Sequence, residues 1–230
     1  MAHPYHHSLS SSRKFGGTPS DYQPIHDWFD HTKAIYGNFR HRALRHHTEG
    51  VAMAASVFGS QITNSDGTQV AVVEIGRQHI IEDCGTVVRA FDWLGGLTDL
   101  GRLTPKPVSV EEQSALSVRK LGGVLTDYLP LHSFLDEFEG CGVGFLALRH
   151  HSWGLFDAEQ VFGSVLKLST GVKVPVRYVG ELHLMAQFGR IPSALDFLEK
   201  IPAEKWMLHA AGPAARELKT LSQTIGESSR

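Results

Sequence analysis

The chain has 230 residues, of which 42% are hydrophobic, so it can bury the apolar core of one large domain or of two small ones. Its formal net charge of −2 disfavours a broad nucleic-acid-binding surface, and its two cysteines provide neither a zinc ribbon nor a disulfide framework. No apolar run approaches the roughly 20 residues of a membrane-spanning helix and the start of the chain lacks an apolar signal segment, so we expect a cytoplasmic protein without a membrane partner.

Two helices are expected first along the chain. Asp21 is a suitable N-cap for an amphipathic helix, and Pro24 would stand in the first turn of that helix. A longer helix is predicted over residues 40–58, and the Phe-Gly pair that ends in Gly59 is its stop signal.

A hairpin and two short helices complete the first half of the chain. The segment QITNSDGTQVAVV has Asp66-Gly67 at its centre, which is typical of a tight turn between two strands. The next segment predicts a short helix that carries His79 and ends at Gly85, and another helix is expected over residues 86–94.

The second half repeats these elements, which makes the chain a tandem duplication. The aligned segments are 13–30 with 119–136 (nine of 18 positions identical), 41–59 with 145–163 (10 of 19) and 70–94 with 174–198 (8 of 25). We predict an α+β fold that is mainly α, with two homologous repeats of about four helices and one hairpin each. The repeats are expected over residues 1–100 and 101–212, paired with each other, and a tail follows over 213–230.

Histidine is unusually frequent, with 14 residues, and four positions recur in both repeats. Histidine is the commonest metal-binding side chain and titrates near neutral pH. The recurring pairs are His26/His132, His46/His150, His47/His151 and His79/His183, and carboxylates recur at Asp30/Asp136 and Asp92/Asp196. Further candidate side chains occur only in the first repeat, namely His31, His41, Glu49, Glu82 and Asp83.

Helical spacing separates the histidines of the predicted 40–58 helix. His46 and His47 fall on the two adjoining stripes that hold most of the apolar residues, whereas His41 and Arg45 fall on the outer face. We therefore predict that the recurring pair points into the repeat and that the other two side chains point to solvent.

Buried imidazoles need partners, because an unsatisfied buried polar group costs about 1–3 kcal/mol. One solution is a divalent ion such as zinc, iron or manganese, for which Asp30 or Asp83 would orient a ligand or act as the catalytic base. The predicted ligands are His26, His46, His47 and His79. The alternatives are a hydrogen-bonded network that uses Asp30, Asp92 or backbone carbonyls, and an acid–base site without a metal.

The second repeat gains aromatic residues at positions that face outward in the predicted helix. These residues are Phe145, Trp153 and Phe156. Because an outer face that becomes apolar usually packs against another surface, we predict that this face docks on the first repeat or joins copies of the chain in a homo-oligomer.

Several segments together resemble a family of small bacterial and phage proteins that is known only as a domain of unknown function. The segments are HPYHHSLSSSRKFGG, DYQPIHDWFD, RHRALRHHTEG, ITNSDG and GRIPSALDFL. Members typically carry one copy of the pattern, whereas this chain carries two. The resemblance implies no activity, but it favours a phage or prophage source, and hence the host cytoplasm or a virion as the location.

Two functions from different classes follow from these patterns. The first is a divalent-metal-binding protein, extending to a metal-dependent hydrolase in which the ion activates a bound water molecule. The second is a non-catalytic phage or bacterial structural or interaction protein, whose histidines form a buried hydrogen-bond network.

Overall fold

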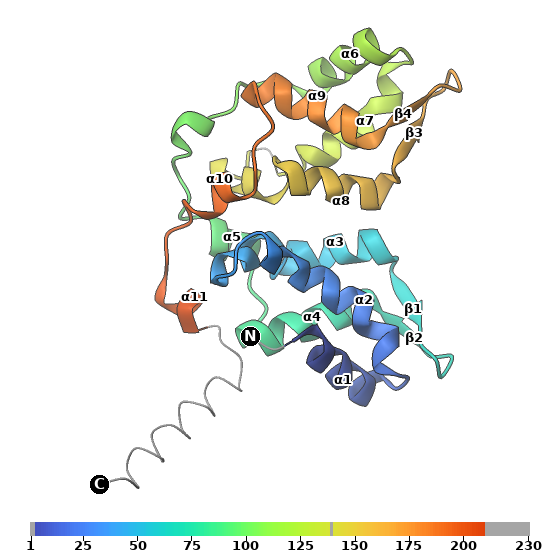
Figure 1. Ribbon diagram of the computed structural model, residues 1–230, viewed down its shortest axis with the longest axis vertical. Helices are drawn as coiled ribbons and strands as arrows, with labels where there is room; N and C mark the ends of the chain where they lie inside the picture. Colours follow the sequence, from blue (N-terminus) through green and yellow to red (C-terminus); the bar gives the residue numbers. More distant parts are fainter. Residues whose placement is uncertain (1–2, 139, 210–230) are drawn as a thin grey trace, which may run out of the picture. The chain divides into compact units, whose positions relative to one another are not determined.

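The computed structural model describes residues 3–138 and 140–209 (Figure 1). The described residues form two compact units. The first unit comprises the residues up to Ala90 and those from Ala203 onward, and the second unit comprises Phe91 to Pro202. Each unit is mainly helical and contains one two-stranded antiparallel hairpin, which confirms the predicted fold class. The repeat boundaries at residues 100 and 212 stay predictions, and the tail over 213–230 lies outside the described residues.

Apart from η1, which has no counterpart among the described residues of the second unit, the two units contain the same elements in the same order. The first has α1 (Pro4–Phe15), α2 (Pro19–Asp30), η1 (His31–Ala34), η2 (Phe39–Leu44), α3 (Thr48–Phe58), β1 (Gln61–Thr63), β2 (Gln69–Ala71) and α4 (Val72–Cys84). The second has α6 (Val110–Leu121), α7 (Leu125–Leu135), η4 (Val143–Leu148), α8 (Ser152–Phe162), β3 (Val165–Lys167), β4 (Lys173–Pro175) and α9 (Val176–Phe188). Shorter helices are α5 (Ala90–Leu94), η3 (Gly101–Leu103), α10 (Leu195–Leu198) and α11 (Lys205–His209).

Helix α1 was not predicted, because the face that it buries is polar. Its N-cap is His3, whose Nδ1 accepts a hydrogen bond from the backbone N–H of Tyr5, and Pro4 occupies the first helical position. The buried side chains of α1 are those of His7, Ser8 and Ser11. Helix α6 has the same character in the second unit, where Gln113, Ser114 and Ser117 are buried.

The start of α2 differs from the prediction by one turn. Thr18 is the N-cap, and Asp21 stands three residues later, where its carboxylate accepts hydrogen bonds from the backbone N–H groups of Thr18 (2.7 Å) and Ser65 (3.1 Å). Pro24 therefore lies inside the helix, beyond its first turn. These hydrogen bonds lower the pKa of Asp21 to about 2, and they join the start of α2 to the β1–β2 turn.

The hairpins agree with the sequence patterns. Strand β1 pairs with β2 from Gln61 opposite Ala71 to Thr63 opposite Gln69, and Gly67 takes the positive φ of +80° that the turn requires. The predicted stop signals are also confirmed, since Gly59 is the C-cap of α3 and Gly85 is the C-cap of α4.

The predicted 40–58 helix is wrong in its first third. Residues 39–44 form a 3₁₀ helix, the chain turns at 45–47, and the α-helix begins only at Thr48. His47 is the N-cap of α3, and its Nδ1 accepts a hydrogen bond of 3.0 Å from the backbone N–H of Gly50. The predicted outward direction of His41 and Arg45 is also wrong, since the side chains of both are buried.

A long-range contact explains the turn. The Arg45 guanidinium lies 3.9 Å from the centre of the Trp28 ring and donates a hydrogen bond to the Trp28 carbonyl. Gly50 permits the fold-back, because a Cβ atom at this position would stand only 2.0 Å from the Arg45 carbonyl oxygen. The second repeat has the same turn, with Arg149 over the Phe134 ring at 3.7 Å and Gly154 in place of Gly50.

Apolar residues from the same elements form the core of each unit. In the second unit the core includes Tyr128, Leu131, Ala158, Leu168, Val174, Val176 and Val179. Phe145 is buried and its ring contacts those of Phe91 and Phe138, whereas Trp153 and Phe156 are half-buried and pack edge to face at 5.8 Å. The proposed docking or oligomer role of this face stays a prediction. Among the described residues, no helix is both long and apolar enough to cross a membrane.

Candidate metal centre

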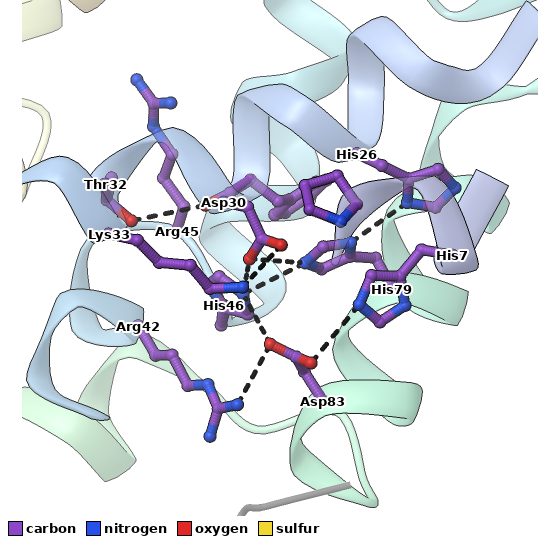
Figure 2. Close-up of polar contacts among 12 residues, drawn as sticks. His7, His26, Asp30, Thr32, Lys33, Arg42, Arg45, His46, His79 and Asp83 are labelled. Atoms are coloured by element: carbon purple, nitrogen blue, oxygen red, sulfur yellow. Dashed lines mark hydrogen bonds and ion pairs between the residues drawn. The ribbon is translucent and has the colours of Figure 1, made fainter. Parts of the chain in front are cut away.

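The first unit brings two histidines and two aspartates together in its interior. Helix α2 supplies Asp30 at its last residue, the turn before α3 supplies His46, and α4 supplies His79 and Asp83 one helical turn apart (Figure 2). We call these four residues the first-repeat cluster. Their residue exposures are 0–5%, so the cluster is screened from solvent.

The donor atoms of the first-repeat cluster have the spacing of ligands around one ion. His46 Nε2 lies 3.1 Å from His79 Nε2, 3.6 Å from Asp30 Oδ1 and 3.4 Å from Asp83 Oδ2. His79 Nε2 is 3.6 Å from the same oxygen of Asp30, and all four donor atoms lie within 4.8 Å of one another. Ligand atoms that each bind a metal at about 2.1 Å are themselves about 3.0–3.5 Å apart.

A serine–histidine chain fixes the orientation of His79. Its Nδ1 lies 3.0 Å from Nδ1 of His26, and Nε2 of His26 lies 2.9 Å from Oγ of Ser11. His26 is thus placed behind His79, outside the group of four donor atoms. In known metal sites the second nitrogen of a ligating histidine is held by an outer hydrogen bond of this kind.

His7 is the residue of this region that the sequence did not single out as a ligand or partner. It comes from α1, with Nδ1 at 2.6 Å from Glu82 Oε2 and Nε2 at 3.4 Å from Asp83 Oδ1, and its ring centre is 4.3 Å from that of His79. Burial lowers the pKa of His7, but the two carboxylates outweigh burial and raise it to about 9. The only sequence signal was its place in the HPYHH start, which is confined to the first repeat.

Cationic side chains hold the two aspartates. Lys33 Nζ lies 2.6 Å from Asp30 Oδ2, and an Arg42 guanidinium nitrogen lies 3.1 Å from Asp83 Oδ2. Burial raises the pKa of each aspartate, but the neighbouring histidines, together with Arg42 at Asp83, lower it well below the ordinary range. Both carboxylates are therefore ionised at neutral pH.

The imidazoles of His79 and His26 are neutral at the same pH. Burial lowers the pKa of His79 to about 4, with a further contribution from the charge of His46, and burial together with His79 lowers the pKa of His26 to about 2. A neutral imidazole keeps the lone pair that binds a metal.

The remaining predicted residues lie elsewhere. His47 caps α3 and faces Glu49 at 3.3 Å, so it is not brought to the cluster, and the Nδ1 of His41 contacts the Asn38 carbonyl. Asp92 is exposed and belongs to the second unit. Of the six predicted site residues, the structure brings together Asp30, His46, His79 and Asp83, with His26 directly behind them.

The second unit has a reduced version of the same arrangement. Asp136 Oδ1 lies 2.9 Å from His150 Nε2 and 3.3 Å from His183 Nε2. The chain behind it is kept, with His132 Nδ1 at 3.0 Å from His183 Nδ1 and Ser117 Oγ at 2.9 Å from His132 Nε2. Asp83 has no carboxylate counterpart, because position 187 is glutamine.

The family of the chain follows from a match to a family model. The model described as domain of unknown function (DUF6915) matches residues 2–100 and again residues 109–207. The chain belongs to this family and carries its domain twice, as the resemblance of the sequence indicated. No curated protein and no solved structure matches the chain.

Proposed function

We propose that the first repeat is a divalent-metal-binding domain whose ligands are Asp30, His46, His79 and Asp83. The observation that carries the proposal is the convergence of four donor atoms from α2, α4 and the turn before α3, which all lie within 4.8 Å of one another, with four of the six separations at 3.1–3.6 Å. Two imidazole nitrogens and two carboxylate oxygens suit zinc, iron(II) or manganese(II), the three ions that the sequence predicted.

An unsatisfied oxygen supports the same proposal. Asp30 Oδ1 is buried, points to His46 and His79, and has no hydrogen-bond partner among the described residues. A buried carboxylate oxygen without a donor is costly, and a cation at the centre of the cluster would satisfy it.

The burial of the cluster favours a structural ion. An ion bound there would join the end of α2 to the turn before α3 and to α4, which are far apart along the chain. Four protein ligands complete a tetrahedral zinc site, whereas a six-coordinate iron or manganese ion would keep about two positions for water. The predicted hydrolase activity needs such an open position for water, so it would require a six-coordinate iron or manganese ion at this site.

The metal content of the untagged protein tests the proposal. We expect purified wild type, dialysed against zinc, iron(II) or manganese(II), to retain an ion at the first repeat by elemental mass spectrometry. Asp83→Gln should weaken binding, because it removes one carboxylate and gives position 83 the residue that the second repeat has at position 187. His46→Ala should remove the ion.

The matched control variant is His47→Ala, which changes the neighbouring histidine outside the cluster. Circular dichroism of each variant shows whether it is folded. Equal metal content in wild type and folded His46→Ala would overturn the proposal. If wild type retains no metal and the substitutions only destabilise the protein, the result would support the hydrogen-bond network instead.

A further inference from the structure

Among the buried side-chain atoms of the described second unit that lack a hydrogen-bond partner, three belong to Asp136 and to two residues that contact it, His183 and Gln187. The atoms are His183 Nε2, Asp136 Oδ2 and Gln187 Oε1, counted over the described residues. Their residues are 0%, 7% and 6% exposed, so water at the surface does not satisfy these atoms. Unpaired polar atoms are rare in protein interiors, and their clustering points to a missing ligand.

The donors of this second-repeat cluster are two histidines and one carboxylate. Asp136, His150 and His183 each offer one ligand atom, and these atoms lie within 4.8 Å of one another. Two histidines with one carboxylate form a known ligand set for iron(II), in which the remaining coordination positions stay open.

Gln187 provides a fourth oxygen next to this set. Its Nε2 lies 3.2 Å from Asp136 Oδ1, while its Oε1 is one of the three unpartnered atoms. An amide group can be turned by half a rotation with almost no change in shape. This rotation of the amide would place Oε1 beside Asp136 and the histidines. There the carboxylate of Asp136 repels the amide oxygen unless a cation lies between the two groups.

We propose that the second repeat binds its own divalent ion through Asp136, His150 and His183, with the amide oxygen of Gln187 as a weaker fourth ligand. The outer support for His183 is present, since the chain through His132 to Ser117 has the same distances as its counterpart in the first repeat. The ion in the second repeat has one anionic ligand instead of two, so it binds more weakly and keeps positions for water. The inference stands whether or not the first repeat binds metal.

Manganese(II) is the probe for the test, because electron paramagnetic resonance measures the free ion in the presence of protein. We expect wild type to bind about two ions per chain, with the weaker ion lost in His150→Ala and in His183→Ala. In His46→Ala, the weaker ion should remain. Gln187→Asp in the His46→Ala background should tighten it by at least about tenfold, because the change adds the second carboxylate.

The outcomes separate this inference from the function proposed for the first repeat. If folded His46→Ala binds no manganese, the second-repeat site is refuted. This holds whether or not the added carboxylate of Gln187→Asp creates binding in the same background. If wild type and His46→Ala bind the same single ion and His150→Ala binds none, the second-repeat site holds and the first-repeat site fails. Because Gln187→Asp gains binding, a loss caused only by misfolding cannot imitate the expected result.

Discussion

His7 and Asp83 are the residues by which the two clusters differ most. Asp83 faces His46 with Oδ2 and His7 with Oδ1, so the same carboxylate contacts both imidazoles, and in the proposed function His7 orients it toward the ion. The second repeat has lost both members of this pair, since glutamine occupies positions 113 and 187. The two residues thus occur together in one copy and are both replaced in the other, as expected if His7 positions Asp83.

We predict that His7→Gln weakens metal binding at the first repeat by about 10- to 100-fold, the usual effect of losing an outer partner of a ligand. The replacement is the residue that the second repeat carries at the equivalent buried position of α6, so α1 should still form. Titration with zinc monitored by calorimetry measures the change. Lys14→Gln, on an exposed position of the same helix, is the control, and an unchanged affinity of His7→Gln would show that His7 does not position Asp83.

At the scale of elements, the sequence was sufficient wherever the determinant was local. Glycine stop signals and the Asp66-Gly67 turn correctly gave the ends of α3 and α4 and the hairpin. The turn at 45–47 could not be predicted, because the apolar spacing runs through it without interruption. Its cause is the contact of Arg45 with Trp28, which lies on another helix, and no helical pattern of a single segment contains that information.

For the site too, the sequence was sufficient where the determinant was local and insufficient where it depended on distant segments. The recurrence of His46 and His79 and the proximity of Asp30 to His26 along α2 were enough to select most of the cluster. His47 is buried, as its predicted inward direction implies, but it lies outside the cluster, because it is the N-cap of α3 and that role depends on where the helix begins. His7 was missed because α1 buries hydroxyl and imidazole groups, and a search for apolar periodicity passes over such a helix.

We predict that His47→Ala lowers the free energy of unfolding by about 1 kcal/mol, the usual cost of losing an N-cap. Metal affinity should stay within about twofold of wild type, because the side chain lies outside the cluster. Urea denaturation and zinc titration give the two quantities. The matched variant is His151→Ala, whose side chain caps α8 in the same way, and a complete loss of metal by His47→Ala would contradict its assignment as a cap.

We predict a larger effect for Gly50→Ala, about 1–3 kcal/mol or more, because the added methyl group collides with the Arg45 backbone and the turn has to shift. His46 is part of that turn, so metal binding should weaken together with stability. Thermal denaturation with and without zinc measures both effects. Gly37→Ala, at a position where a Cβ atom meets nothing within 4 Å, is the control and should be nearly neutral.

At the scale of the whole molecule, the duplication places two versions of one site in a single chain. An ion that binds only the folded state stabilises it by about 2.7 kcal/mol when the free ion is 100 times its dissociation constant. We therefore predict that a chelator lowers the midpoint of thermal unfolding of wild type. Calorimetry of His46→Ala should show a smaller effect of the chelator, and an identical shift in the two proteins would indicate that the first repeat holds no stabilising ion.

The turn before α3 also explains how one copy of the domain can change its ligands while both copies stay folded. The groups that build the turn, Arg45 on Trp28 with Gly50 in one copy and Arg149 on Phe134 with Gly154 in the other, include none of the proposed donor atoms. The residues that set the shape of the turn are therefore separate from the positions at which the clusters differ, 7 and 83 in one copy and 113 and 187 in the other. For protein design, the domain is a helical frame whose buried cluster has two carboxylates in one copy and one in the other, a difference made by a single residue at positions 83 and 187.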